Sequence, residues 1–293
     1  MDKSWSANQF QINIPEVYQL ELTNQCNLHC PHCIRALANR PTGYLDISLL
    51  QKMVSRGDFA GSFFVEFQMY GEPLMHPHFD KIVDYMKENT NVKLGLSTNG
   101  ALIPKWTNAI SKLDYLTISV DSADKATYES MRGCSYDELL SNTEMVLKQN
   151  PRPVVDLQVI NFFDGRNNLP DLVKLAKQHN WDVICRAVYD CFAAYYGRAH
   201  PDRFGDLCLN PWLSVSVHWD GDVVPCCFSS GKEVVYGNLN DASLRTIWNE
   251  SQQRRQLMYR QRHGQNLIPC SKCYMRSPAL LHLRMLMNNL KEQ

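Results

Sequence analysis

The first two thirds of the chain alternate between short apolar runs and longer amphipathic stretches. The short runs are rich in β-branched and aromatic residues and have the length of buried strands. They are Tyr18–Thr23, Phe63–Met69, Val92–Ser97, Tyr115–Val120, Val154–Ile160 and Asp182–Val188. The stretches between them carry apolar residues at helical spacing and are Ile47–Arg56, Pro77–Glu88, Pro104–Lys112, Tyr136–Lys148 and Leu169–His179. This order predicts an α/β fold with a parallel sheet curved into a barrel or partial barrel, and its catalytic groups follow the strands.

The pattern changes after about residue 200. Trp212–His218 alternates like a strand, Asp220-Gly221 is a hairpin-turn signal, and Val223–Cys226 is the expected return strand. Ala242–Arg262 then has the pattern of a single helix, with Leu244, Ile247, Trp248 and Leu257 on its apolar side. We therefore expect two domains, residues 1–200 and residues 201–293, the second a small α+β unit ending in an amphipathic helix over Leu281–Leu290.

Charge and composition narrow the function classes. Lys plus Arg and Asp plus Glu both number 30, so the formal net charge is zero and gives no basic field for nucleic acid or an anionic membrane. The first residues lack the apolar segment of a signal peptide, and no apolar run approaches the length of a spanning helix. We expect a cytoplasmic protein without a membrane or nucleic-acid partner. In that compartment, a set of 11 cysteines indicates metal binding or catalysis.

Three cysteines, Cys26, Cys30 and Cys33, follow the first predicted strand at the spacing CX3CX2C. Three thiolates on one short loop can hold a four-iron cluster and leave one iron open to an exogenous ligand. The alternative is a zinc site in which His29 or His32 supplies the fourth ligand.

A CX3CX2C loop after the first strand of a β/α chain resembles the radical S-adenosylmethionine (SAM) superfamily. The resemblance implies that Cys26, Cys30 and Cys33 hold a [4Fe–4S] cluster whose open iron is chelated by SAM. It also implies cleavage of SAM to a 5′-deoxyadenosyl radical, hydrogen abstraction from a substrate, and a flavodoxin- or ferredoxin-type electron donor.

Short motifs after the next strands extend the resemblance over roughly residues 18–188. Tyr70-Gly71-Glu72-Pro73 resembles the family's Gly-Gly-Glu-Pro loop with Tyr70 in place of the first glycine, so Gly71 and Glu72 are expected near the SAM ammonium. The other implied SAM contacts are Asn99, in Ser97-Thr98-Asn99-Gly100, then Ser119 and Asp121, and Arg132. Two of these have local alternatives: Asn99 as a turn residue and Asp121 as a helix N-cap.

A second group, Cys208, Cys226, Cys270 and Cys273, has four thiolates that can saturate either one [4Fe–4S] cluster or one zinc. The surrounding sequence resembles the SPASM/twitch extension of radical SAM enzymes, in its shorter form with a single auxiliary cluster. Cys227 adjoins Cys226, and the spacing to Gly221 favours Cys226 as the ligand.

The other cysteines, Cys134, Cys185, Cys191 and Cys227, are either small buried residues or hydrogen-atom donors to a substrate radical. Cys191 and Cys134 are the first candidates for a donor, because they follow predicted strands.

Three functions fit these features. Family members of this size oxidise or epimerise small polar sugars and aminocyclitols, and only about 17 residues precede the first strand, fewer than a leader-binding domain needs. We therefore expect a dehydrogenase or epimerase of such a substrate, with a maturase of a ribosomally made peptide as the alternative. A third possibility is a non-catalytic binding protein stapled by zinc at both groups, which would be colourless rather than brown.

Overall fold

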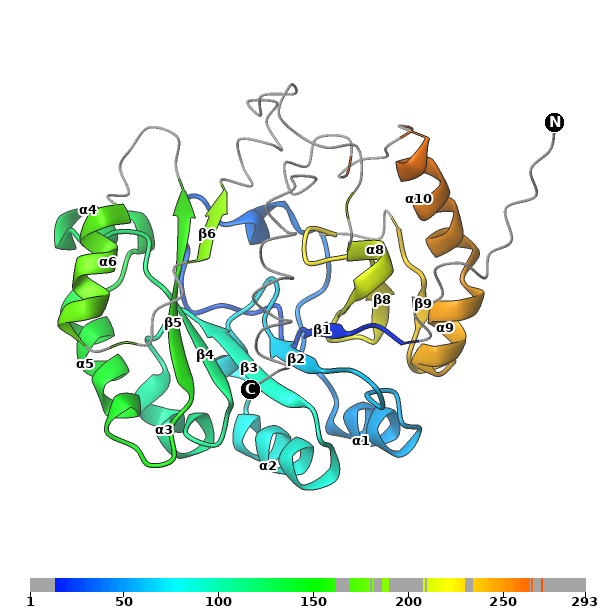
Figure 1. The fold of residues 1–293 in the computed structure, drawn as a ribbon, viewed down its shortest axis with the longest axis horizontal. Helices are drawn as coiled ribbons and strands as arrows, with labels where there is room; N and C mark the ends of the chain where they lie inside the picture. The colour runs from blue at the N-terminus through cyan, green and yellow to red at the C-terminus, as the bar shows by residue number, and fades with distance from the viewer. Residues whose placement is uncertain are drawn as a thin grey trace.

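The computed structural model describes residues 14–161, 169–179, 181, 186–189, 208, 210–229, 234–263, 265 and 270. These residues contain one nine-stranded sheet in the order β6-β5-β4-β3-β2-β1-β7-β8-β9 (Figure 1). The first six strands run parallel, each beside the next in the chain, which confirms the predicted partial barrel. Their bounds are β1 Val17–Leu20, β2 Phe64–Phe67, β3 Lys93–Thr98, β4 Tyr115–Ser119, β5 Val154–Asn161 and β6 Arg186–Tyr189.

Helices return the chain between these strands and cover the outer face of the sheet (Figure 1). The five predicted helices are confirmed, with ends that differ by at most two residues. A sixth, α4, had no predicted bounds, although the N-cap alternative for Asp121 implied a helix after that residue: Asp124 caps its start and Gly133, at φ 70°, ends it. The helices are α1 Ile47–Ser55, α2 Phe79–Asn89, α3 Ile103–Ile110, α4 Lys125–Arg132, α5 Tyr136–Leu147 and α6 Leu169–Gln178, with 3₁₀ turns η2 Ile34–Leu37 and η3 Pro73–Met75.

The later part of the chain continues the same sheet. Strand β7 pairs in parallel with β1, so that Val17 lies opposite Ser214 and Leu20 opposite Val217. A hairpin that turns at Gly221, with φ 89°, brings β8 antiparallel to β7. The elements are α8 Asn210–Leu213, β7 Ser214–Val217, β8 Asp222–Val224 and β9 Gly237–Asn238. The expected domain boundary at residue 200 lies outside the described residues.

Two predictions for this region need correction. The strand predicted to start at Trp212 starts at Ser214, because Asn210–Leu213 form a helical turn and the Ser214 hydroxyl donates to the Asn210 carbonyl. The single helix predicted over Ala242–Arg262 is two, α9 Leu244–Glu250 and α10 Gln252–Arg262.

Ser251 causes the break between α9 and α10. Its backbone, at φ −61° and ψ 118°, is extended, and its side chain accepts a hydrogen bond from the Arg254 N–H as the N-cap of α10. The Arg254 guanidinium in turn donates to the Trp248 carbonyl at 2.8 Å, near the end of α9. The residues predicted for the apolar side, Leu244, Ile247, Trp248 and Leu257, are all buried.

Polar contacts fasten α9 to the segment after α1. The Asp58 carboxylate accepts the Leu244 N–H at 2.9 Å, at the first turn of α9. Arg56 donates to the Leu239 carbonyl at 3.0 Å, and Lys52 donates to the Asn240 carbonyl. The two parts of the chain therefore share a sheet and a buried polar contact.

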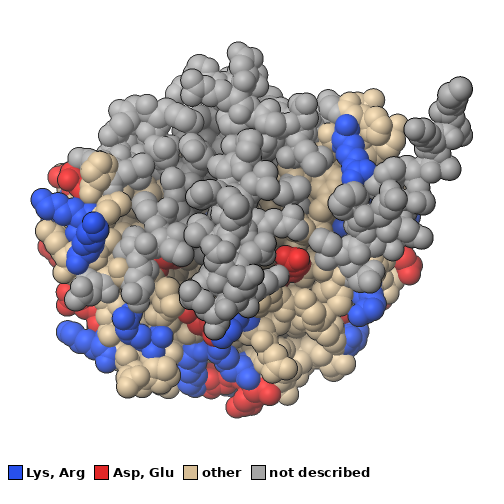
Figure 2. Space-filling model, viewed as in Figure 1, with Lys and Arg blue, Asp and Glu red and all other residues tan. Residues whose placement is uncertain are grey.

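The surface of the described helices carries charges of both signs. Figure 2 shows Lys and Arg mixed with Asp and Glu along the lower edge of this face. Asp114 binds both Lys87 and Lys93, and Asp84 binds Lys112. None of the helices in the described residues has the length and apolar character needed to cross a membrane. The helix predicted over Leu281–Leu290 lies outside these residues.

Candidate functional site

The segment between β1 and η2, residues 21–33, is called the cysteine loop. Hydrogen bonds hold its first residues in place. The Asn24 amide donates to the Pro41 carbonyl at 2.8 Å and accepts the Gly43 N–H at 3.0 Å, while the Thr23 hydroxyl donates to the Gly43 carbonyl at 2.6 Å. A turn closed by the Cys33 N–H and the Cys30 carbonyl, 3.0 Å apart, leads into η2. The three predicted cluster ligands thus project from a loop whose backbone is fixed.

The loop Tyr70-Gly71-Glu72-Pro73, called the Gly71 loop, packs directly against the cysteine loop. A β-carbon at Gly71 would lie 2.1 Å from the Thr23 carbonyl oxygen and 2.6 Å from that of Gln25. The next N–H, of Glu72, donates to the Gln25 carbonyl at 2.7 Å. Met69, which precedes the loop, has φ 128°, a strained value for a residue with a side chain. Only glycine fits at position 71, because the two backbones touch there.

Glu72 is buried and joins the ends of β2 and β3. Its carboxylate accepts hydrogen bonds from the Thr98 hydroxyl at 2.8 Å, the Asn99 N–H at 2.8 Å and the Leu74 N–H at 3.2 Å. Burial raises the pKa of Glu72 to about 7, against these hydrogen bonds. Its expected contact with SAM stays a prediction; in the described residues the carboxylate holds Asn99 in place.

Asn99 fulfils the turn role and also reaches the cysteine loop. Its side-chain oxygen accepts the Ala101 N–H at 3.0 Å. Its amide nitrogen donates to the Asn27 side chain at 2.9 Å and lies 3.8 Å from the Cys26 sulfur.

Asp121 and Arg132 are brought together beside the cysteine loop. The Arg132 Nε lies 2.6 Å from an Asp121 carboxylate oxygen, and the His32 Nε2 lies 3.2 Å from the same oxygen. The Cys30 thiol points at the Arg132 carbonyl, 3.6 Å away. The N-cap alternative for Asp121 is wrong, because Asp124 caps α4. Ser119, also predicted here, ends β4 and is half-buried.

The thiols of the first group are not gathered tightly enough in the described residues to bind a single zinc as they stand. Sulfurs on one tetrahedral zinc, with bonds of about 2.3 Å, lie about 3.8 Å apart. Among the described residues, the three loop thiols do not form a group with all ligand atoms within 4.8 Å. His32 is engaged with Asp121 and His29 is exposed, so neither is placed as a fourth ligand. Burial raises the pKa of Cys26 to about 11, and burial also raises that of Cys30, and a bound metal ion or cluster would favour the thiolate form of both.

Three of the four cysteines of the second group lie near one buried phenol, that of Tyr236. Burial raises the pKa of Tyr236, Arg254 opposes the rise, and the thiols of Cys226, Cys270 and Cys208 add to it as neighbouring charges. Cys227 and Cys226 both neighbour Tyr70, whose pKa is raised by burial and then by these two thiols. The preference for Cys226 over Cys227 as the ligand stays a prediction. Cys273 lies outside the described residues, so the set of four is still a prediction.

A buried ion pair links the two sites, and sequence reasoning missed it. Glu21 accepts two hydrogen bonds from Arg40, at 2.7 and 2.9 Å, and its oxygens also accept the backbone N–H groups of Tyr70 and Trp219. The carboxylate thus touches the Gly71 loop and the hairpin that leads to Cys226. Glu21 falls inside a predicted strand, so the pattern gave no sign of this role.

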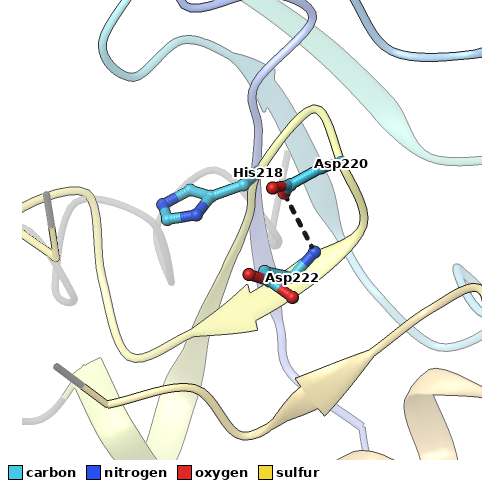
Figure 3. Close-up of side chains that lie close together, drawn as sticks. All are labelled: His218, Asp220 and Asp222. Atoms are coloured by element: carbon cyan, nitrogen blue, oxygen red, sulfur yellow. Dashed lines mark hydrogen bonds between the residues drawn. The ribbon is translucent and has the colours of Figure 1, made fainter. Parts of the chain in front are cut away.

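A second arrangement of potential ligands lies in that hairpin. The ligand atoms of His218, Asp220 and Asp222 lie within 4.8 Å of one another (Figure 3). Each group is engaged in holding the turn, however: Asp220 accepts the Asp222 N–H, Asp222 accepts from Asn238, and His218 contacts the Ser229 carbonyl. These contacts explain the cluster as turn structure.

The two candidate hydrogen donors have different outcomes. Cys134 is half-buried, lies 3.3 Å from the Tyr128 hydroxyl and packs against the core. Cys191 lies outside the described residues, as does Cys185. A donor role for Cys134 or Cys191 remains a prediction.

Comparison with known proteins identifies the family. Residues 20–188 match the Radical SAM superfamily, and residues 208–274 match an iron-sulfur cluster-binding domain, SPASM. The GTP 3′,8-cyclase of Chlorobaculum tepidum is 27% identical over 170 residues, 56% of this chain and 51% of the relative. The mycofactocin maturase MftC of Mycolicibacterium smegmatis is 23% identical over 89% of this chain and 76% of its own length. The chain spans about half the length of the GTP 3′,8-cyclase relatives that it matches.

Solved structures show the same fold at low sequence identity. Streptococcus suis SuiB bound to the precursor peptide SuiA matches with a TM-score of 0.65 and 14% identity, over 83% of this chain and 66% of SuiB. BtrN in complex with AdoMet and 2-DOIA matches with a TM-score of 0.52 and 18% identity, over 86% of this chain and 88% of BtrN. With the family match covering more than half of its residues, the chain belongs to the radical SAM superfamily and carries a SPASM iron–sulfur domain, which implies SAM and [4Fe–4S] clusters as cofactors.

Proposed function

We propose that this radical SAM enzyme abstracts a hydrogen atom from a peptide substrate and modifies it. The observation that carries the proposal is the meeting of the cysteine loop, the Gly71 loop and the Cys226 hairpin around one buried carboxylate, Glu21.

At the first site, some residues would bind the cluster and others hold neighbouring side chains in place. Cys26, Cys30 and Cys33 would hold the SAM-binding [4Fe–4S] cluster, which supplies the electron that cleaves SAM to methionine and a 5′-deoxyadenosyl radical. Asp121 fixes Arg132 and His32 beside the loop, and Glu72 fixes Asn99. Rigid support of this kind keeps the reacting groups within the narrow range that hydrogen abstraction requires. The reductant would be a flavodoxin- or ferredoxin-type protein.

The second site points to an oxidative outcome. Cys208, Cys226 and Cys270, with Cys273, would hold an auxiliary [4Fe–4S] cluster, which supplies a one-electron acceptor. Removal of a hydrogen atom, then a proton and an electron, oxidises the substrate by two electrons. A thiol that returned a hydrogen atom would make the product an epimer instead.

Relatives that cover most of the chain support a peptide as substrate. The mycofactocin maturase of M. smegmatis matches 89% of this chain, and SuiB has been solved with its precursor peptide. A small polar sugar or aminocyclitol is the second candidate. It is favoured by BtrN, which was solved with 2-DOIA and is covered to 88% by this chain.

Anaerobic reconstitution tests the enzyme class. The chain, supplied with iron and sulfide, should bind about eight irons and cleave SAM when reduced. Cys26→Ala should abolish that cleavage, and Tyr259→Phe, an exposed position on α10, should leave it unchanged. A protein that bound about two zincs and left SAM intact would overturn the proposal.

Deuterium transfer tests the substrate class. Short peptides encoded beside the gene and a panel of sugars and aminocyclitols, each deuterated on carbon, are incubated with the reduced enzyme and SAM. We expect deuterium in 5′-deoxyadenosine with a peptide. Transfer from members of the small-molecule panel alone would refute the peptide proposal.

A further inference from the structure

The second cysteine group has a hydrogen-bond donor on α10. Gln261 is 1% exposed, and its amide nitrogen donates to the Cys270 sulfur over 3.5 Å. In the described part of the chain, its amide oxygen has no hydrogen-bond partner. A buried side-chain amide normally makes hydrogen bonds with both its nitrogen and its oxygen. Because the nitrogen of this amide is directed at a thiol, it is placed to donate a hydrogen bond to that sulfur.

Tyr236, which directly precedes β9, offers a second donor. Its N–H donates to the Val223 carbonyl at 2.7 Å, continuing the β8–β9 ladder. The ladder places Tyr236 opposite Val224, two residues before Cys226. Its side chain is buried, and among the described residues its hydroxyl has no hydrogen-bond partner. A buried phenol O–H is normally paired, and three cysteines of the second site lie near enough to this one to act on it as neighbouring charges.

The buried guanidinium of Arg254 lies near the Tyr236 phenol. Arg254 is 8% exposed, stacks on the Trp248 ring at 3.5 Å, and donates to the carbonyls of Pro211 and Trp248. Burial lowers the pKa of Arg254 to about 10, which leaves it charged at neutral pH. No carboxylate forms an ion pair with Arg254 in the part of the chain that the structure describes. Buried charges are ordinarily compensated, and a four-iron cluster with four thiolates is an anion.

We propose that Gln261 and Tyr236 donate hydrogen bonds to the sulfurs of the auxiliary cluster and, with the Arg254 cation, raise its reduction potential. The inference rests on the proposed cluster at the second cysteine group. Hydrogen bonds and positive charge stabilise the reduced state of a cluster more than the oxidised state, because the reduced state carries one more negative charge. A raised potential would suit this cluster to accept an electron from a strongly reducing substrate radical.

The test isolates the auxiliary cluster in the full chain. Replacing Cys26, Cys30 and Cys33 by alanine leaves only the second group to bind iron, so one redox signal remains. In this background, Tyr236→Phe removes one hydroxyl and Gln261→Met removes the amide at similar length. The matched control is Tyr259→Phe, which removes a hydroxyl from the exposed face of α10.

Each protein is reconstituted anaerobically, analysed for iron and titrated potentiometrically with detection by electron paramagnetic resonance. We expect about four irons per chain throughout, a more negative midpoint potential in Tyr236→Phe and in Gln261→Met, and no change in the control. The Fe–S stretching bands in resonance Raman spectra should shift in the same two variants. These bands report a lost hydrogen bond even in a preparation with partial iron loading.

The outcomes separate the inference from the function on which it rests. Unchanged potentials and unchanged Fe–S bands in both variants, with four irons bound, would overturn the donor roles while leaving the proposed enzyme intact. Binding of zinc without iron at the second group would overturn both the donor roles and the auxiliary cluster. Cleavage of SAM by the unaltered chain is measured separately and tests the first site alone.

Discussion

The contact at Gly71 makes the sharpest prediction about the site. An added β-carbon would lie 2.1 Å from the Thr23 carbonyl oxygen, whereas a carbon and a carbonyl oxygen in close contact are about 3.3 Å apart. The Gly71 loop and the cysteine loop must therefore separate by about 1 Å in Gly71→Ala. The obstructing atoms are backbone, so no side-chain rotation relieves the overlap.

The separation would propagate to the cluster ligands. The Glu72 N–H binds the Gln25 carbonyl at 2.7 Å, and the Glu72 carboxylate positions Asn99, which contacts Asn27 in the cysteine loop. A displacement of about 1 Å at a catalytic site can cost about 100-fold in rate. We expect Gly71→Ala to lower reductive SAM cleavage by about that factor and to destabilise the fold by about 1–3 kcal/mol through overpacking.

The assay counts 5′-deoxyadenosine per chain under anaerobic reduction, with iron content and thermal unfolding measured on the same samples. Gly57→Ala is the control: Gly57 has a positive φ of 71°, which Gly71 does not, and its added carbon would lie 3.7 Å from the nearest atom, so it tests backbone strain without the backbone overlap. The control should lose about 1 kcal/mol of stability and keep its rate of SAM cleavage. A Gly71→Ala protein that cleaves SAM at the unaltered rate with full iron content would refute the claim that this contact positions the site.

Three further substitutions test ion pairs and hydrogen bonds that stabilise the site and the fold. Asp121→Asn removes the charge that compensates buried Arg132, so unfolding by denaturant should show a loss of about 3 kcal/mol, and Arg132→Met in the same chain should restore part of it. Asp58→Asn weakens the acceptor for the first turn of α9 and should lower the melting temperature by several degrees, while Asp84→Asn, at an exposed pair, should leave it nearly unchanged. Burial alone would raise the pKa of Asp114, but hydrogen bonds from Lys87, the Leu94 N–H and Lys93 together lower it. Its stabilising effect is therefore complete above the unfolded pKa near 4 and is lost as the pH falls through the lower folded value, and Asp114→Asn should flatten the acid limb of the stability profile.

The repeating strands and helices were predictable because strands such as β2 and β4 are buried along most of their length, while the helices bury one face. Apolar runs and helical periodicity therefore survive in the sequence. The bounds of helix α4 were not predicted, and its cap was expected at Asp121, because its signals are the caps Asp124 and Gly133 rather than a long apolar stripe. The break at Ser251 was missed for the same reason, since one hydroxyl on a backbone N–H decides it.

At the site, motifs predicted which residues gather but not how they contact each other. Spacing alone placed Cys26, Cys30 and Cys33 on one loop, and the loop lies where β1 ends. By contrast, the pairing of Asp121 with His32 joins residues on different strands' loops. Local sequence carries no record of such a contact, because it depends on the order of the strands in the sheet.

The position of β7 explains why the two cysteine groups are coupled. A strand that pairs with β1 brings the residues after it, His218 and Trp219, to the same edge of the sheet as the residues after β1. Glu21 follows β1 directly, so its carboxylate can bind the Trp219 N–H at 3.2 Å while it holds Arg40 and the Tyr70 backbone. A charge buried so completely must keep all of these partners, since each donor lost would leave the carboxylate less compensated. Movement of the hairpin that leads to Cys226 would therefore break hydrogen bonds to Glu21, which lies at the start of the cysteine loop. The relative position of the two cysteine groups is thus fixed by the pairing of β7 with β1 rather than by the chain between them.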